Sequence, residues 1–113
     1  MLPAINRLRK TKDIEKVFKN GKGLKEGTLF LKAATNILNF SRFAFVAGQK
    51  SSKKATERNR IKRRMREAIR PSLKLIKPGF DIVITALHGS ADKNFEELKK
   101  SVDILIKKMK LIK

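Results

Sequence analysis

The sequence predicts an α+β fold, most simply a two-layer α/β sandwich in which helices pack on one small mixed sheet. Three features predict it: an apolar strand at residues 80–87, a helical spacing of apolar residues at 53–70 and again near the C-terminus, and the succession of helices and strands. The predicted order is α-β-β-α-β-α. The 113 residues suit one domain, residues 1–113, with a core that needs no covalent cross-links.

The first predicted helix covers residues 11–20. Thr11 is the expected N-cap, and Asp13 lies near the positive end of the helix dipole. Apolar residues follow at i, i+3 and i+4, namely Ile14, Val17 and Phe18. Residues 20–23 (NGKG) suit left-handed backbone and are expected to end the helix.

Two strands are predicted next, at residues 28–34 and 42–47, with a loop or short turn at 36–39 between them. The second strand is rich in aromatic and branched residues and is expected to be partly buried on both faces. Residues 48–54 then form a polar, cationic connection to the central helix.

The last strand and the last helix follow the central helix. A turn signal at residues 77–79 precedes the strand at 80–87, whose apolar run is the strongest in the chain. Asp92 or Asn94 is expected to cap the final helix. Its apolar positions are spaced by 3, 4, 3 and 4 residues: Phe95, Leu98, Val102, Leu105 and Met109.

The central helix, residues 53–70, is strongly basic and has two different faces. It carries nine Lys or Arg residues against two Glu, and Pro71 bars its regular continuation. On a helical projection one face holds Ile61, Met65, Ala68 and Ile69, and another holds Asn59, Arg63, Arg66 and Arg70. The first face is expected to dock into the core, and the second offers planar guanidinium groups to a polyanion.

The charge of the whole chain supports a polyanionic partner. The net charge is +19, and the surplus is concentrated in residues 1–25 and 50–74. Such a charge indicates nucleic acid most often. An anionic membrane surface is the other option, although it requires a broader apolar helix face. A solvated helix that only keeps the protein soluble would intersperse more Glu among its cations.

Composition also bears on compartment. The chain has no cysteine, which excludes disulfides and cysteine-based zinc sites and is compatible with a reducing compartment. No apolar run approaches about 18 residues, and no signal peptide is visible, so a cytoplasmic protein without a membrane span is expected.

The residues that usually carry catalysis are few and scattered. His88 is the only histidine, and it follows a strand, where surface exposure is the usual outcome. Asp13 and Glu15 lie on different faces of their helix, and Ser51 and Ser52 have no clear base partner. We therefore predict a protein that binds but does not catalyse, with no catalytic residue and no metal ligand of its own.

The seven phenylalanines are the only aromatic residues. Most of them are expected to lie in the core. Phe18 and Phe30 are the expected exceptions because they belong to elements that flank the N-terminal basic block. An exposed phenylalanine beside cations can stack on an unpaired base.

Residues 55–68 closely resemble the signature of the bacterial ribonuclease P protein family. That signature is an Arg-Asn pair on a long helix, followed by Lys-Arg and a further Arg before Glu or Gln. Its positions here are Arg58, Asn59, Arg60, Lys62, Arg63 and Arg66. The resemblance extends to the final helix and to residues 6–10, 13–21, 42–50 and 78–84.

The chain departs from the family pattern at three places. Ile14 stands where the family often has Phe, and Lys32 stands near a common aromatic position on the first strand. The usual two lysines followed by Gly-Asn are represented by Lys and Ser within residues 50–54. Stacking in the cleft would then fall to Phe18 and Phe30.

The resemblance implies a subunit of a ribonucleoprotein endonuclease that removes the 5′ leader of precursor tRNA, while the RNA subunit performs the hydrolysis with Mg²⁺. It implies RNA-binding residues Lys50, Lys53, Lys54, Arg58, Asn59, Arg60, Lys62, Arg63, Arg66 and Arg70. It implies a leader cleft formed by Arg7, Arg9, Ile14, Phe18, Phe30 and Lys32. It also implies a left-handed crossover of the central helix between parallel strands, against the usual right-handed rule.

Two alternatives come from other functional classes. A ribosomal or general RNA-binding protein of similar fold would show no preference for precursor tRNA. A self-sufficient nuclease would need the carboxylate and histidine groups that the sequence does not bring together. Cleavage of precursor tRNA with and without a bacterial-type catalytic RNA distinguishes the three.

Overall fold

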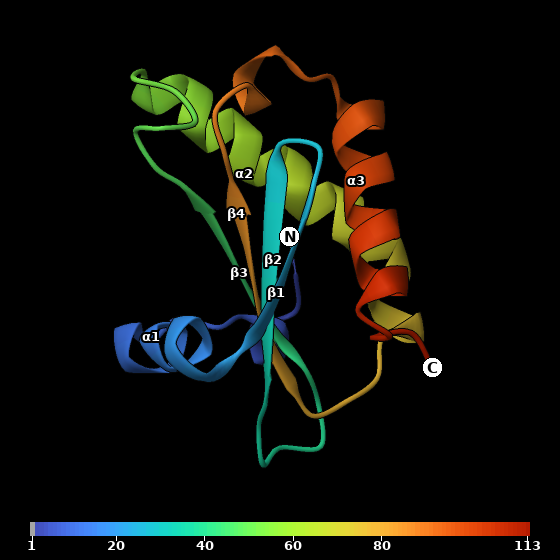
Figure 1. Cartoon of the computed structure of the whole chain (residues 1–113). Coiled ribbons are helices and arrows are strands. Elements are labelled where there is room, and N and C mark those ends of the chain that lie inside the picture. The colour runs from blue at the N-terminus through green and yellow to red at the C-terminus, as the bar shows by residue number, and fades with distance from the viewer. Residues whose placement is uncertain (1) are drawn as a thin grey trace.

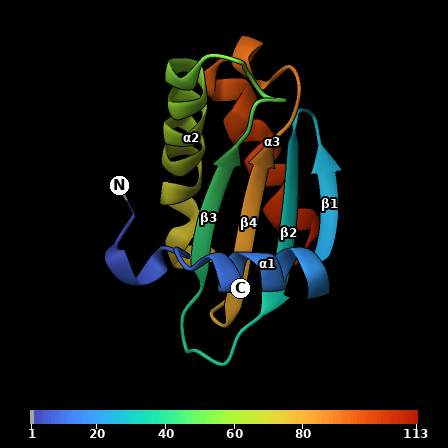
Figure 2. The ribbon, with the colours of Figure 1, turned by 90° about the vertical axis from the view of Figure 1, so that its left-hand side faces the viewer.

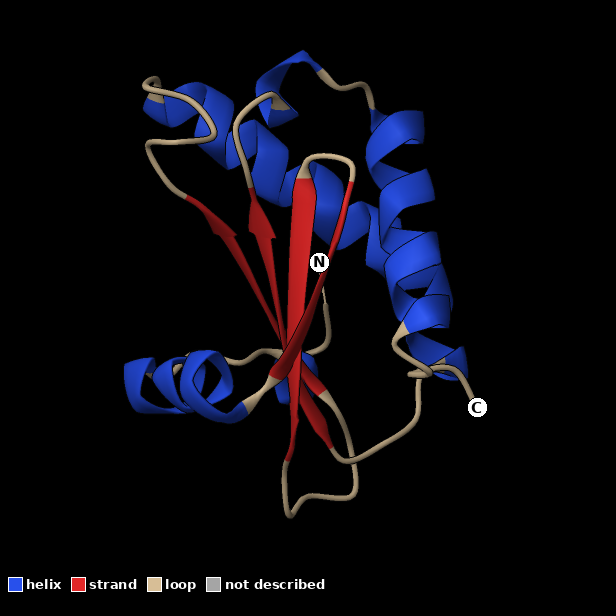
Figure 3. Ribbon diagram, viewed as in Figure 1, coloured by secondary structure: helices blue, strands red, loops and turns tan. Residues whose placement is uncertain are grey.

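A computed structural model describes residues 2–113 of the chain (Figure 1). The order of elements is α-β-β-β-α-β-α, with three short 3₁₀ segments (Figure 3). The helices and strands are α1 Thr11–Asn20, β1 Lys22–Glu26, β2 Leu29–Thr35, β3 Arg42–Ala47, α2 Ala55–Ile69, β4 Phe80–Ala86 and α3 Phe95–Lys108. The 3₁₀ segments are η1 Ala4–Asn6, η2 Arg70–Leu75 and η3 Ser90–Asp92. The α+β class and the mixed sheet are confirmed, with one strand more than predicted.

The four strands form one sheet in the order β1-β2-β4-β3. The pairs β1–β2 and β2–β4 are antiparallel, whereas β3 and β4 are parallel and are joined through α2. Figure 2 views the sheet from the side of α1, with β3 and β4 pointing upward, β4 to the right of β3, and α2 behind the sheet. This crossover is left-handed, as the family resemblance implied.

The strand β1 was not predicted, because its sequence KGLKE has one apolar side chain, Leu24, and no β-branched or aromatic residue. It pairs with β2 from Lys22 opposite Ala33 to Glu26 opposite Leu29, and Gly27 makes the turn with a φ of 60°. The pairing partner, and not local propensity, therefore specifies this edge strand.

The ends of α1 differ from the prediction. Lys10, not Thr11, is the N-cap residue and makes no side-chain capping hydrogen bond, while Asp13 lies in the first turn as expected. Gly21 has an extended backbone with a φ of −80°, so the expected left-handed ending is wrong. Glycine is needed there for close approach, because a Cβ would lie 2.5 Å from the carbonyl oxygen of Val17.

The larger core lies between the sheet and the pair α2 and α3. The predicted apolar face of α2 is buried in it, namely Ile61, Met65, Ala68 and Ile69. The predicted face of α3 contributes Leu98, Val102 and Leu105, and Asn94 caps α3 in a capping box with Glu97. Phe43 is buried here, and Phe45, Phe80 and Phe95 pack against this core.

The opposite face of the sheet carries only α1 and the N-terminal segment (Figure 1). A small cluster of Leu8, Val17, Ala44 and Val83 holds them there. The predicted two-layer arrangement thus describes the larger side, and α1 adds a partial layer on the other. None of the helices within residues 2–113 has the length and apolar character needed to cross a membrane.

Candidate nucleic-acid interface

The polar stripe of α2 points away from the larger core. Asn59, Arg63 and Arg70 are exposed, and Arg66 is half-buried. Arg70 lies 3.7 Å from Glu67 in an exposed ion pair, a contact of the kind that contributes little to stability. The guanidinium groups of Arg63 and Arg70 are therefore accessible for planar contacts with phosphate.

Two arginines of the signature have partners within the protein. The Nη1 of Arg58 donates hydrogen bonds to the carbonyl oxygens of Ser52 and Lys53, at 3.1 and 2.9 Å. The Nη2 of Arg60 lies 3.8 Å from Glu57, and its buried Nε has no hydrogen-bond partner among the described residues. Arg58 thus fixes the connection that precedes α2, a structural role that the sequence did not indicate.

The same connection carries the lysines of the predicted interface. Lys50, Lys53 and Lys54 are exposed beside the N-terminal end of α2, while Lys62 is half-buried on the helix. The hydroxyl of Ser52 donates to Glu57 and accepts from the backbone N–H of Lys54. The hydrogen bond from Ser52 lowers the pKa of Glu57, which keeps this carboxylate ionised close to the lysines.

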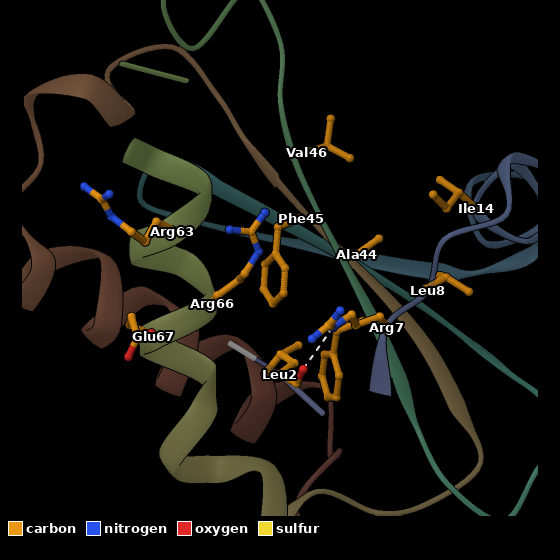
Figure 4. A pocket seen from close by; sticks show the side chains of 11 residues that line it. Leu2, Arg7, Leu8, Ile14, Ala44, Phe45, Val46, Arg63, Arg66 and Glu67 are labelled. Atoms are coloured by element: carbon orange, nitrogen blue, oxygen red, sulfur yellow. Dashed lines mark hydrogen bonds between the residues drawn. The ribbon is translucent and has the colours of Figure 1, made fainter. Parts of the chain in front are cut away.

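A cleft of about 530 Å³ lies between the N-terminal segment, α1, β3 and α2 (Figure 4). It brings together residues from both predicted sets, because Arg7 and Ile14 line it opposite Arg63 and Arg66. The other lining residues are mostly apolar: Leu2, Leu8, Phe43, Ala44, Phe45, Val46 and Glu67. The cleft therefore combines an apolar floor with guanidinium groups at its rim.

Phe45 is a cleft residue that the sequence analysis assigned to the core. Figure 4 shows its ring beside the guanidinium group of Arg66. An arginine over an aromatic ring is favoured by the ring quadrupole. Phe45 also packs against the larger core, so its ring is only partly exposed to the cleft.

Arg7 fixes the N-terminal segment that closes one side of the cleft. Its Nε donates to the carbonyl oxygen of Leu2 at 2.9 Å, and Arg7 bridges to Phe43 on β3. The backbone N–H of Leu8 donates to the carbonyl oxygen of Phe43 at 2.8 Å. The segment thus continues the sheet edge beside β3.

The remaining predicted leader residues lie outside this cleft. Phe18, with 39% of its surface exposed, lies on the C-terminal half of α1, and Arg9 is exposed in the lead-in. The ring of Phe30 lies over Gly23, since a Cβ on that glycine would be 2.5 Å from the ring Cζ. The Nζ of Lys32 donates to the carbonyl oxygen of Phe18. Figure 2 shows α1 crossing the sheet from β3 to β1, so the predicted set falls into two groups, one toward each end of α1.

A buried ion pair holds α1 against the sheet between these two groups. Arg42 donates from Nε and Nη2 to the two carboxylate oxygens of Asp81, at 2.9 and 2.7 Å, and its Nη1 lies 3.5 Å from Asp13 on α1. The hydrogen bond to Asp81 raises the pKa of Arg42. The carboxylate of Asp81 also accepts a hydrogen bond from the side-chain amide of Asn36 at 2.9 Å. Its buried charge is therefore stabilised by hydrogen bonds from the protein.

The carboxylates of the described chain do not gather into a metal centre. No group of three or more His, Asp or Glu residues within 2–113 is arranged to hold a metal ion, and His88 is exposed after β4. The arrangement of cations around an apolar floor is suited to binding a polyanion that also carries flat apolar groups.

Comparisons with known proteins relate the chain to one protein family. A sequence model of the family "Ribonuclease P" matches residues 2–110. The ribonuclease P protein component of Alkaliphilus oremlandii is 35% identical over 111 residues, which cover 98% of this chain and 96% of that protein. The corresponding protein of Clostridioides difficile is 36% identical over 102 residues, which cover 89% of each chain.

Solved structures show the same fold. The ribonuclease P protein of Thermotoga maritima matches with a TM-score of 0.78 and 30% identity, over 89% of this chain and 96% of that one. The Staphylococcus aureus protein matches in fold with a TM-score of 0.86 and 22% identity, over 96% and 98% of the two chains. The chain therefore belongs to the bacterial ribonuclease P protein family, the protein component of a tRNA-processing ribozyme endonuclease.

Proposed function

We propose that the protein binds the catalytic RNA subunit of ribonuclease P through the exposed face of α2 and holds the 5′ leader of precursor tRNA on the α1 face of the sheet. It thereby assists the Mg²⁺-dependent, RNA-catalysed removal of the leader in the cytoplasm. The observation that carries the proposal is the cleft in which Arg7, Arg63 and Arg66 surround an apolar floor.

The chemistry of the α2 stripe supports an RNA partner. Asn59, Arg63 and Arg70 are exposed, and arginine makes bidentate contacts with phosphate that lysine cannot make. Lys50 and Lys53 add point charges at the start of the helix. A structured RNA is recognised mainly through its backbone and shape, for which such an array is suited.

The cleft and its neighbouring group support a single-stranded ligand. An unpaired strand presents both phosphates and unstacked bases, which match guanidinium groups at a rim and apolar side chains at a floor. Ile14 and Phe45 line the floor, and Phe18 is exposed further along α1. A leader that crosses the sheet beside α1 would contact both groups in turn.

The pairing of acidic residues with arginines supports the assignment of Mg²⁺ to the RNA subunit. Asp13 and Asp81 are paired with Arg42, and Glu67 lies beside Arg70. The chain therefore contributes positive charge around the leader, and the metal ligands would come from RNA phosphates.

The test is binding and cleavage by the reconstituted ribonucleoprotein. In Arg63→Ala/Arg66→Ala, affinity for the catalytic RNA should fall, and the salt dependence should weaken by about 0.7–0.9 in slope for each lost phosphate contact. The melting temperature should stay close to that of the wild type, because such surface changes usually cost within about 0.5 kcal/mol.

The matched control is Lys93→Gln/Lys100→Gln, which removes one positive charge just before α3 and one from its first half, away from the cleft. It should bind the catalytic RNA nearly as the wild type does. If both variants lost the same affinity for the catalytic RNA, net charge alone would explain the effect. That result would contradict a specific interface on α2. A wild-type protein that neither binds the catalytic RNA nor stimulates cleavage of precursor tRNA would refute the proposal as a whole.

A further inference from the structure

A second cluster of cations lies on the side of the molecule opposite α1, around η2 and the C-terminal segment (Figure 1). We define it as the C-terminal lysine patch, which consists of five exposed lysines: Lys74, Lys77, Lys107, Lys110 and Lys113. None of the five has an ion pair with another residue in the described part of the chain. The neighbouring Lys108 is excluded because it lies 3.7 Å from Glu26.

Two segments distant in sequence are joined to form the patch. Ile76 and Ile112 form an antiparallel bridge. The backbone N–H of Lys77 donates to the carbonyl oxygen of Leu111, and that of Lys113 donates to the carbonyl oxygen of Leu75, both at 2.7 Å. The bridge therefore holds the lysines of η2 and those of the C-terminal segment on one surface.

The patch contains no side-chain carboxylate, which is unusual for an ordinary solvated surface. Residues 68–80 and 104–113 include no Asp or Glu. The acids that border these two segments are Glu67, Asp81 and Asp103, and they pair with Arg70, Arg42 and Lys99. The five acids of residues 75–113 all precede residue 104, so every charged side chain of residues 104–113 is cationic.

Lys110 occupies a position where glycine is the usual residue. The C-terminus of α3 is a Schellman motif, in which Leu111 N–H donates to Ile106 O and Lys110 N–H donates to Lys107 O, both at 3.0 Å. Lys110 is the position in the left-handed conformation, with a φ of 57°, and no other non-glycine residue within 2–113 has a positive φ. A side chain at this position opposes folding, because its Cβ crowds the backbone in that conformation.

The helix dipole accounts for part of the patch only. Lysines in the last turn of a helix interact favourably with its C-terminal end, which covers Lys107. The interaction with the helix dipole does not extend to Lys74, Lys77 and Lys113, which lie outside the last turn of α3. At Lys110 the same interaction is opposed by the energetic cost of the left-handed backbone. The lysine at this strained position supplies a charge that folding does not require, which favours a role outside folding.

We propose that the C-terminal lysine patch is a second RNA-binding surface that contacts the phosphate backbone of a further segment of the catalytic RNA. The proposal rests on the proposed function, since it assumes a protein embedded in that RNA. Lysines act as point charges on phosphates, and contacts to the phosphate backbone do not read bases. A leader in the cleft lies on the α1 side, so the patch requires a different RNA segment.

The sharpest test is Lys110→Gly. Glycine relieves the left-handed strain, so the melting temperature should rise by a few degrees while affinity for the catalytic RNA falls. One lost phosphate contact should weaken binding about four- to sixfold at 0.15 M salt, the effect that a slope change of about 0.7–0.9 gives relative to 1 M salt. Lys110→Arg keeps the charge and should retain the affinity.

A charge-matched pair extends the test to the bridge. Lys77→Gln/Lys113→Gln should lower the salt slope by about 1.4–1.8, whereas Lys93→Gln/Lys100→Gln at the other end of α3 should leave it nearly unchanged. Higher melting temperature with unchanged affinity and slope in Lys110→Gly would overturn the proposal. Unchanged RNA affinity combined with lost binding to phosphatidylglycerol vesicles would also overturn it, in favour of a membrane surface.

The same titrations separate the patch from the proposed function. If Arg63→Ala/Arg66→Ala loses affinity and the patch variants do not, the patch proposal fails while the role of α2 stands. If the wild-type protein does not bind the catalytic RNA at all, the proposed function fails and the patch proposal fails with it.

Discussion

The two faces of the sheet are packed very differently. Among residues 2–113, eighteen buried residues form the core on the side of α2 and α3, whereas four form the cluster on the side of α1. We call the side of α2 and α3 the thick face and the side of α1 the thin face. The thin face is also held by polar contacts: Arg42 joins Asp81 and Asp13, and Lys32 binds the carbonyl oxygen of Phe18.

This difference shows how one small sheet can serve both stability and binding. The thick face supplies most of the apolar burial that stabilises the fold. The thin face leaves a cleft and partly exposed side chains that a ligand can reach, and regions with few buried contacts are the ones that adjust on binding. Substitutions on the thick face should therefore reduce stability more than RNA recognition. Substitutions on the thin face should reduce RNA recognition more than stability.

The largest expected effect is on the thick face. Met65 is completely buried, and Met65→Asp would place an unpaired charge among Ile61, Ile69 and the sheet. The free energy of unfolding should fall by more than about 4 kcal/mol, which is enough to unfold a domain of ordinary stability. Circular dichroism and thermal denaturation measure it. The control Met65→Leu should cost less than about 1.5 kcal/mol, and an equal loss in both variants would contradict the packing account.

Arg42→Met, a substitution on the thin face, should lower the free energy of unfolding by a smaller amount. The side chains of Arg42 and Asp81 are 22% and 10% exposed, so the substitution leaves a mostly buried carboxylate without its main partner. The free energy of unfolding should fall by about 3 kcal/mol. Adding Asp81→Asn removes the orphaned charge and should recover part of the loss. If the double variant is no more stable than Arg42→Met, the ion pair does not anchor this face.

The third prediction concerns recognition more than stability. Phe18 is 39% exposed, whereas its neighbour Val17 is buried. Phe18→Ala should weaken affinity of the ribonucleoprotein for precursor tRNA by about 1–3 kcal/mol and leave affinity for mature tRNA nearly unchanged. Equilibrium binding of the two RNAs measures it. Equal losses for both RNAs, or a large fall in melting temperature, would assign Phe18 to the core instead.

The smallest expected effect concerns pH. The hydrogen bond from Ser52 lowers the pKa of Glu57, so its contribution to stability is complete above the unfolded value of about 4.3 and is lost as the pH falls through the lower folded value. In Ser52→Ala the pKa of Glu57 should rise, and stability should depend less steeply on pH in this acidic range. An NMR titration of Glu57 gives the answer, and identical pKa values in both proteins would contradict the coupling.

The periodic elements of the fold could be predicted because their pattern repeats over several turns. The apolar and polar faces of α2 follow from residues 53–70 alone, and β4 and α3 follow in the same way. The sequence analysis drew nothing from Asp81, although a carboxylate within an apolar strand needs a partner. Its identity as Arg42 could not be predicted, because that pairing depends on the parallel register of β3 and β4.

The missed features arise from tertiary context. The edge strand β1 has no strand propensity and exists through its pairing with β2. Phe45 lines the cleft because the sheet places β3 beside the N-terminal segment, and no spacing along the chain reports that contact. The lysine patch depends on the bridge between Ile76 and Ile112, which joins residues that a running charge count treats separately.

The central claim is that the thin face of the sheet holds the leader. Hydrogen exchange of the reconstituted ribonucleoprotein, measured with precursor tRNA and again with mature tRNA, tests it most directly. We expect amides of α1 and β3 to exchange more slowly with the precursor, while those of α3 exchange equally in both complexes. Equal exchange across α1 and β3, or slowing confined to α3, would show that the leader does not lie on this face.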